Sequence, residues 1–248
     1  MDIRFDDKTA IVTGGASGIG FAIAQTLAQS GARVVVADLD GDAAARAADQ
    51  IGHRASSAAV DVTDADAVAT LVDRAVADTG ALHLMVNNAG IAGGGAPTGA
   101  FPVDQWQRII DVNLNGVFYG CRYAIPAIRD AGGGAVLNVA SILGTVGAPT
   151  SPAYVAAKHG VIGLTKSAAL GHAADKVRVN AICPGFIQTP LIDRHLDPAR
   201  QKAIAGLHAL GRMGTAQEVA DLAVFLLSDR AAFITGSAHV VDGGYIAQ

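Results

Sequence analysis

The sequence predicts an α/β fold in which helices cover both faces of a doubly wound parallel sheet. Short apolar runs alternate with segments of helical periodicity along the 248 residues. The runs are apolar throughout, which is typical of parallel strands buried on both faces. Hydrophobic residues make up 51% of the chain and charged residues 16%, a composition that supports a large buried core.

The chain begins with a βαβ unit. Thr9–Thr13 is a short apolar strand that runs into a glycine turn, Gly14–Gly20. A helical pattern follows at once and is ended by Gly31, a typical helix stop. Val34–Val36 is the next strand, so the unit reads strand, glycine turn, helix, strand.

The same alternation continues to the end of the chain. Further strands are predicted at Ser57–Val60, Leu82–Val86, Ala135–Ala140, Val177–Ile182 and Ala238–Val241. Helices are predicted at Asp42–Ile51, after a cap at Asp64, at Asp104–Arg129, after Ser151-Pro152, at Leu191–Leu210 and from a cap at Thr215 to Leu227. Right-handed crossovers arrange seven strands in the order 3-2-1-4-5-6-7, a Rossmann-like single domain over residues 1–248. Asn113 disfavours the helix around it and predicts a bend or a water site there.

The glycine turn predicts a dinucleotide site. Glycines let the backbone approach a pyrophosphate, which then lies at the positive end of the following helix. Asp38 lies about 20 residues further on, as dinucleotide binding requires. Its carboxylate can accept both ribose hydroxyls of NAD and would repel the 2′-phosphate of NADP, and neither Ser17 nor Leu39 supplies a cation for that phosphate. The alternative is that Asp38 caps the helix that begins near Gly41.

The segment from Ser141 to Lys158 predicts a reaction centre. Tyr154 and Lys158 are four residues apart, so they share one face of a helix. A free tyrosine has a pKa of about 10, and a nearby ammonium favours the phenolate and lowers that pKa. Ser141, at the end of the preceding strand, can hold a substrate oxygen at the same point. The alternative is a surface Tyr and Lys on an ordinary helix.

These residues all follow the carboxyl ends of predicted strands. Ligands of doubly wound sheets bind beyond those ends. The glycine turn, Asp38, Asp61, the Asn87–Gly90 segment, Ser141 and the segment from Pro184 to Thr189 are therefore expected to meet in one pocket. That pocket would hold a dinucleotide beside a reacting group.

Charge and composition exclude other classes of function. The net charge is -4 and there is no basic run, so we expect no nucleic-acid partner. No window approaches a membrane span and no signal peptide is evident at the start, so we expect a cytoplasmic protein without a membrane partner. Cys121 and Cys183 match no metal or redox spacing and are expected to be buried thiols. No residue cluster predicts a catalytic metal.

The chain resembles the short-chain dehydrogenase/reductase family over essentially its whole length. The motifs that carry this resemblance are Thr13-Gly14-x-x-x-Gly18-Ile19-Gly20, Asn87-Asn88-Ala89-Gly90, Asn113, Ser141, Tyr154-x-x-x-Lys158 and Pro184-Gly185. The resemblance implies a catalytic tetrad. Tyr154 would be the acid/base, Lys158 would lower its pKa and bind the nicotinamide ribose, Ser141 would position the substrate oxygen, and Asn113 would hold a water in a proton relay.

The resemblance also implies a cofactor, a lid and an assembly. The cofactor is expected to be NAD, contacted by Gly14, Ser17, Gly18, Ile19, Gly20, Asp38, Leu39, Asp61, Val62, Asn88, Ala89, Gly90, Tyr154, Lys158, Pro184, Gly185, Ile187 and Thr189. Residues 189–211 correspond to the family's substrate lid, and members are commonly homotetramers. The tail ending at Gln248 resembles that of some bacterial alcohol dehydrogenases whose tail contacts a structural magnesium ion at a subunit interface.

The substrate is expected to be a small neutral secondary alcohol or ketone, including cyclic ones. Expected substrate contacts are Ser141, Leu143, Tyr154, Phe186 and Leu191, within apolar walls that also include Ile91, Ala92, Ile142, Val146, Ile187, Ile192 and Leu196. Arg194 and His195 are either polar contacts or solvated positions. The competing activity is a 3-oxoacyl-(acyl-carrier-protein) reductase, which usually prefers NADP. A non-catalytic dinucleotide sensor is the alternative outside enzymes, and such a protein has no need of a complete tetrad.

Overall fold

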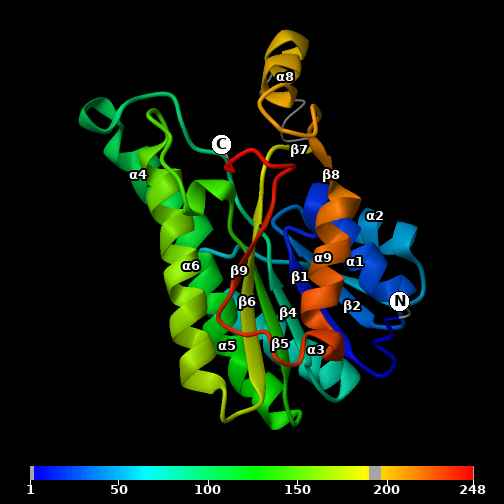
Figure 1. Ribbon diagram of the computed structural model, residues 1–248. Coiled ribbons are helices and arrows are strands. Elements are labelled where there is room, and N and C mark those ends of the chain that lie inside the picture. The colour runs from blue at the N-terminus through cyan, green and yellow to red at the C-terminus, as the bar shows by residue number, and fades with distance from the viewer. Residues whose placement is uncertain (1–2, 190–196, 248) are drawn as a thin grey trace.

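The predicted sheet is confirmed by a computed structural model, which describes residues 3–189 and 197–247 (Figure 1). All seven strands are parallel and lie in the order β3-β2-β1-β4-β5-β6-β9, which is the predicted order because β9 is the last strand of this sheet. The strands are β1 Thr9–Thr13, β2 Arg33–Asp38, β3 Ala55–Ala59, β4 Leu84–Asn87, β5 Gly134–Val139, β6 Val177–Pro184 and β9 Ala238–Val241.

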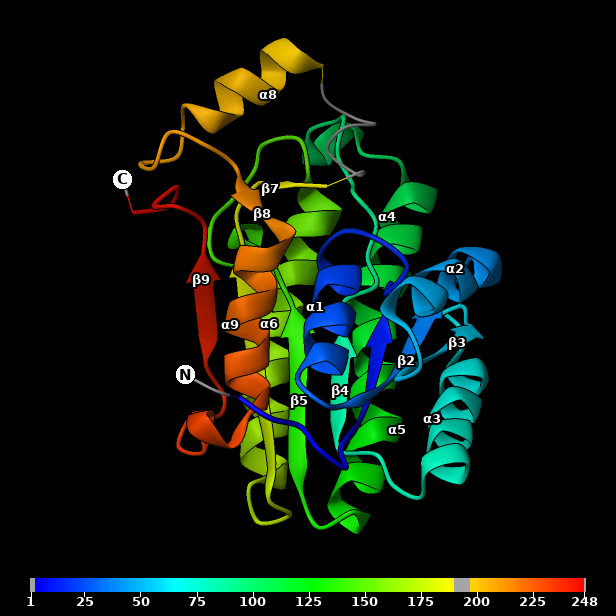
Figure 2. The ribbon, with the colours of Figure 1, turned by 90° about the vertical axis from the view of Figure 1, so that its right-hand side faces the viewer.

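Helices cover both faces of the sheet, so the central strands β1, β4, β5 and β6 are buried on two sides (Figures 1 and 2). One face carries α1 Gly18–Gln29, α2 Gly41–Ile51 and α9 Ala216–Leu227, and the other carries α3 Ala65–Thr79, α5 Gly116–Asp130 and α6 Pro152–His172. Neighbouring residues of β1 show the consequence. Val12 packs into the core of the first face and Ile11 into that of the second, which is why the strand is apolar without alternation.

The predicted helix at Asp104–Arg129 is interrupted. It consists of α4 Val103–Ile110, a π-helical turn at Asp111–Asn115, and α5. The interruption contains Asn113, where the sequence predicted a bend or a water site, and the structure shows a π turn at this position. Its cause is the side chain, which bonds to a neighbouring loop as well as to the helix, and π turns of this kind are frequent at functional sites.

A second, two-stranded sheet was not predicted. β7, Ile187–Gln188, pairs in parallel with β8, Gly214–Thr215. A strand of two residues is too short to show the hydrophobic alternation by which strands are recognised in a sequence. The pairing of β7 with β8 also joins residues that are distant in the chain, so it could not be predicted from local sequence. Between them, α8 (Pro198–Ala205) has no buried residue and stands clear of the body in Figure 2. The predicted helix at Leu191–Leu210 is thus shorter where the structure describes it, and residues 190–196 lie outside the described part.

The short helical segments and the cysteines complete the fold. Among the described residues, 3₁₀ turns lie at Thr98–Ala100, Ile142–Gly144 and Asp229–Ala231. Cys121 and Cys183 are buried and form no disulfide, as predicted. In the part of the chain that the structure describes, no helix is long and apolar enough to cross a bilayer.

Candidate active site

The carboxyl ends of the strands border a cavity of about 1080 Å³. Its position agrees with the pocket predicted from strand ends. Almost all the predicted site residues line it: Gly14, Ser17, Gly18, Ile19, Asp38, Leu39, Asp61, Val62, Asn88, Ala89, Gly90, Asn113, Ser141, Leu143, Tyr154, Lys158, Pro184, Gly185, Phe186, Ile187 and Thr189.

A few predicted residues are not placed in the lining. Gly20 lies behind the glycine turn, where a side chain would clash with the Gly14 carbonyl and the Asn88 amide, so its role is to allow close packing. Val146 is exposed and does not line the cavity. Leu191, with its neighbours Ile192, Arg194, His195 and Leu196, lies outside the described residues.

The glycine turn forms a cradle suited to a phosphate. Gly14 and Gly18 have φ values of +60° and +55°, which side chains disfavour, and a Cβ on Gly14 would lie 2.8 Å from the Cα of Ala89. Ser17 occupies the N-cap of α1, but its hydroxyl caps nothing and the first turn carries no acid. The amide groups at this positive helix end therefore have no anionic partner on their own helix, and the cradle fits a dinucleotide pyrophosphate.

Thr13 and Asn88 fasten this cradle to the end of β4. The Asn88 amide donates to the carbonyls of Thr13 (2.9 Å) and Gly14 (3.0 Å). The Thr13 hydroxyl in turn accepts from the backbone amides of Asn88 and Ala89 at 3.1 and 3.2 Å. The sequence placed Thr13 in a motif but gave it no role. The sequence feature that could have indicated this role is a polar residue at the carboxyl end of an apolar strand.

Asp38 braces the cradle from the neighbouring strand. Its carboxylate accepts from the backbone amides of Ala16 at 3.1 Å and Asp40 at 3.3 Å. The alternative that Asp38 caps α2 is wrong, because Asp40 is the N-cap and accepts from the amide of Ala43 at 2.9 Å. Asp38 is thus left to face the cavity, with the exposed side chain of Leu39 beside it.

Ser141, Tyr154 and Lys158 meet at the other end of the cavity. Tyr154 and Lys158 share one face of α6, as predicted, and the lysine Nζ lies 5.5 Å from the centre of the tyrosine ring. Nζ also donates to the Val139 carbonyl at 2.8 Å, which fixes the buried side chain against β5. Ser141 is held by its own turn, where its Oγ accepts from the amide of Leu143 at 3.1 Å.

The protonation of this cluster differs from the prediction in one respect. Burial raises the pKa of Tyr154, and a hydrogen bond with Ser141 only partly opposes this. Burial also lowers the pKa of Lys158 to about 8. Lys158 is therefore a desolvated cation whose proton is held less tightly than that of an exposed lysine. The net lowering of the tyrosine pKa expected from its neighbour is not observed, because desolvation is the larger effect.

Asn113 is fully buried where the π turn meets the loop after β4. Its Nδ2 donates to the carbonyls of Ile91 and Ile109, both at 3.1 Å, and its Oδ1 accepts from the amide of Ile91 at 3.1 Å. The side chain therefore ties the cavity wall to the interrupted helix. Gly90 allows this approach, since a Cβ there would lie 2.7 Å from Asn113 Oδ1.

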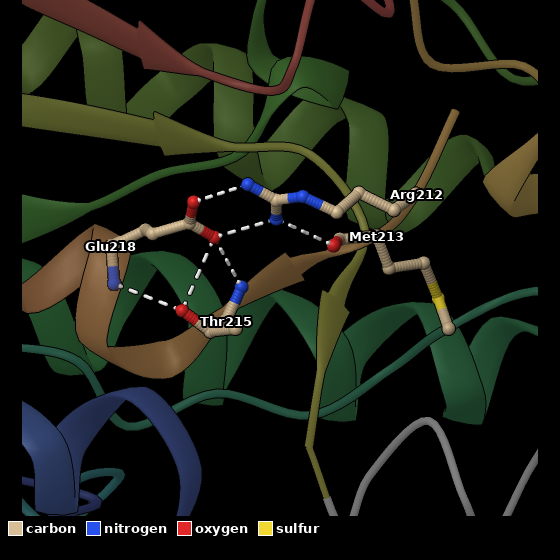
Figure 3. A network of polar contacts seen from close by, with 4 residues as sticks. All are labelled: Arg212, Met213, Thr215 and Glu218. Atoms are coloured by element: carbon tan, nitrogen blue, oxygen red, sulfur yellow. Dashed lines mark hydrogen bonds and ion pairs between the residues drawn. The ribbon is translucent and has the colours of Figure 1, made fainter. Parts of the chain in front are cut away.

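The segment from Phe186 to Thr189 is held by a polar network around Glu218 (Figure 3). The Glu218 carboxylate accepts two hydrogen bonds from Arg212, at 2.6 and 2.9 Å, and one from the amide of Thr215 at 2.8 Å. The Thr215 hydroxyl accepts from the Glu218 amide at 3.2 Å, which completes a capping box on α9. These bonds lower the pKa of Glu218 to about 2. The network fixes β8, which pairs with β7 at the cavity wall.

Comparisons with known proteins agree with this geometry. A family model described as enoyl-(acyl carrier protein) reductase matches residues 14–246. The chain is 46% identical to the cyclohexanol dehydrogenase of Acinetobacter sp. (strain SE19), over 100% of this chain and 98% of that protein. It is also 46% identical to the cis-4-hydroxycyclohexanecarboxylate dehydrogenase of Sinomonas cyclohexanicum, over the whole of both. The crystal structure titled gox2181 has a TM-score of 0.95 at 34% identity and covers 99% of this chain and 98% of that one.

The chain belongs to the short-chain dehydrogenase/reductase family. In this short-chain dehydrogenase/reductase, a buried polar network that the sequence reasoning missed lies behind the site. Asn87 Nδ2 donates to Asn138 Oδ1 at 2.8 Å, and Asn138 Nδ2 donates to Thr165 Oγ1 at 2.9 Å. The network joins β4, β5 and α6, which carry the residues around Tyr154. Its signal is an asparagine within each of two otherwise apolar strands.

No group of three or more His, Cys, Asp or Glu side chains is arranged to hold a metal within residues 3–189 and 197–247. Gln248, at which a structural magnesium ion was considered, is outside that part of the chain.

Proposed function

We propose that this protein interconverts a secondary alcohol and a ketone with NAD as the cofactor, and that Tyr154 is the acid/base. The observation that carries the proposal is that one cavity has the glycine cradle and Asp38 at one end and Ser141, Tyr154 and Lys158 at the other. The names of the similar proteins, which are dehydrogenases of cyclohexanol and a hydroxycyclohexanecarboxylate, support the same reaction class.

The chain's own residues would manage the proton and the substrate oxygen. Ser141 and Tyr154 hold the carbinol oxygen, and the Tyr154 phenolate accepts its proton during oxidation. In reduction, the neutral phenol donates that proton and the serine hydroxyl stabilises the developing negative charge. Lys158 supports the phenolate, and Asn113 ties the loop after β4 to the interrupted helix at the cavity wall. A bound nicotinamide dinucleotide supplies the hydride acceptor or donor.

Asp38 supports NAD over NADP. Its carboxylate lines the cavity at the end of β2, where a ribose hydroxyl can donate to it and a 2′-phosphate would be repelled. This preference argues against the competing 3-oxoacyl-(acyl-carrier-protein) reductase activity. The complete tetrad argues against a non-catalytic sensor.

Apolar walls support a small neutral substrate, and the relatives favour a cyclic one. Ile91, Ala92, Ile142, Leu143 and Phe186 line the cavity. Such a surface gains affinity from the carbon ring of a cyclohexanol by burying it. A substrate lid at about residues 189–211 is proposed as part of the same domain, 1–248, together with a cytoplasmic location.

A homotetramer is proposed from the family's common assembly. The large exposed side chains of Trp106 on α4 and Phe118 on α5, at 38% and 47% exposure, support contacts along these helices. Sedimentation velocity at micromolar concentration tests this, and a monomer would contradict it.

The proposed reaction is tested by following NAD reduction with linear, cyclic and aryl secondary alcohols, with NADP in parallel. We expect turnover with cyclohexanol and NAD, and little with NADP. Binding of NAD without turnover of any alcohol would favour the sensor, and a preference for NADP would contradict the role of Asp38.

A further inference from the structure

Ser151 presents an unused hydroxyl to the substrate end of the cavity. It is the N-cap residue of α6, as the sequence predicted, but its side chain makes no cap hydrogen bond. By contrast, the N-cap side chains of α2, α3, α8 and α9 all accept from their helix amides. Ser151 is half-buried and lines the cavity, and its hydroxyl has no hydrogen-bond partner among the residues the structure describes.

The hydroxyl lies one helical turn from the proposed acid/base. Ser151 is the N-cap of α6 and Tyr154 lies three residues further on, in the first turn of that helix. Ser141, Ser151 and Tyr154 all line the same cavity. A ring whose carbinol oxygen contacts Ser141 and Tyr154 therefore occupies the cavity that Ser151 also lines, where a second ring oxygen can reach its hydroxyl.

Gly94 keeps this hydroxyl uncovered. A Cβ on Gly94 would lie 2.8 Å from Ser151 Oγ and 3.3 Å from the Thr150 carbonyl oxygen. The loop is held in place because the amide of Gly95 donates to that same carbonyl at 2.9 Å. Any side chain at position 94 would crowd the hydroxyl, so the glycine leaves it open to a ligand.

We propose that Ser151 is a specificity-determining residue that selects ring alcohols bearing a second neutral oxygen, a hydroxyl or a keto group. A half-buried hydroxyl without a protein partner can both donate a hydrogen bond to a second ring oxygen and accept one from it. Arg108 also lines the cavity, and its guanidinium would pair with a carboxylate on the ring. The inference rests on the function proposed above and names the substrate class of the same site.

The test compares cyclohexanol with cyclohexane-1,4-diol and with 4-hydroxycyclohexanecarboxylate in NAD reduction by the full chain. In Ser151→Ala, kcat/KM for the diol should fall roughly three- to tenfold, the worth of one hydrogen bond, while cyclohexanol changes less than about twofold. Gly94→Ala, at a position with ordinary backbone, should reproduce the selective loss by crowding the hydroxyl. Thr150→Ala is the matched control, because its side chain is exposed and does not line the cavity.

The outcomes separate this inference from the proposed function. Turnover of cyclohexanol with no selective loss in Ser151→Ala would overturn the role of Ser151 and leave the proposed function standing. Equal losses for all three substrates would show a structural role and overturn it as well. A preference for the carboxylate that survives Ser151→Ala would assign the position to Arg108. Absence of turnover with every ring alcohol would overturn both proposals.

Discussion

Tyr154 is placed in surroundings that favour its neutral form. Burial raises its pKa, and the nearby ammonium of Lys158 is itself weakened by burial. A neutral phenol is the form needed to protonate an alkoxide, so the acid/base role proposed for Tyr154 predicts ketone reduction at neutral pH and alcohol oxidation at higher pH.

Replacement of Tyr154 by phenylalanine tests its chemical role with little change in packing. We expect kcat to fall by about 10²- to 10⁴-fold, the usual contribution of a positioned acid/base, while cofactor binding persists. Steady-state rates and cofactor titration measure the two effects. Tyr119→Phe on α5 is the control, since Tyr119 does not line the cavity. Unchanged turnover in Tyr154→Phe would contradict the assignment.

The direction of the pKa shifts predicts opposite pH profiles for the two reactions. Oxidation needs the phenolate, and the pKa of Tyr154 is raised, so kcat/KM for an alcohol should increase with pH between about 7 and 10. Reduction needs the phenol and should not increase over that range. Loss of the Lys158 proton near its pKa of about 8 removes support for the phenolate, so the increase should become less steep above that pH. Initial rates in both directions across this range provide the check, and an oxidation rate that is highest at neutral pH would be inconsistent with a buried phenol.

At the scale of elements, the position of β7 depends on a network outside the cavity. β7 is only two residues long and is held by β8, which Arg212 and Glu218 fix to the start of α9 (Figure 3). A Cβ on Gly214 would lie 2.7 Å from Cδ1 of Ile187, so the two strands are in direct contact. By fixing β8, the network also fixes β7 and hence the place of Ile187 and the following Thr189 in the cavity wall.

Glu218→Gln is expected to weaken the contact with Arg212 and so to hold β8 and β7 less firmly. The variant loses the paired charge, so the KM for the cofactor should increase about two- to fivefold while kcat changes little, as for an exposed ion pair. The difference in cofactor KM between Glu218→Gln and the wild type should become smaller in high salt, because salt screens the exposed ion pair of the wild type. Asp78→Asn, which breaks an exposed ion pair with Arg74 on α3, serves as the control. Equal effects of the two substitutions on KM would argue against a positioning role.

The elements also show what a sequence can and cannot predict. The seven strands and their order were predictable because buried parallel strands are apolar throughout and crossovers have one hand. At Asn113 the sequence predicted a bend or a water site and not the π turn, since the Asn113 side chain bonds to the carbonyl of Ile91, 22 residues away. The β7–β8 pair was missed for the same reason. Secondary-structure propensity reflects only local sequence, whereas the π turn and the β7–β8 pair depend on contacts between residues that are distant in the chain.

At the scale of the whole molecule, the candidate active site is formed by the sheet as a whole and not by one element. The lining residues come from the ends of β1, β2, β4, β5 and β6 and from helices on both faces, so no single element contains the cavity. Most of the lining was predictable because parallel strands place their carboxyl ends at one edge. The protonation state of Tyr154 and Lys158 was not, because it depends on burial, which no motif records.

A cofactor that bridges these elements should stabilise the whole fold. Binding to the folded state alone raises stability in proportion to the logarithm of ligand concentration over Kd, so NAD at about 100 times Kd should raise Tm by roughly 5 to 10 °C. NADP at the same concentration should raise it less, because Asp38 faces the position of its extra phosphate. Asp38→Asn should narrow the difference between the two cofactors while keeping an acceptor for the Ala16 amide. Asp40→Asn is the matched control, because Asp40 caps α2 and does not line the cavity. Differential scanning fluorimetry measures all six combinations of protein and cofactor, and equal Tm shifts for NAD and NADP in the wild type would show that Asp38 does not select the cofactor.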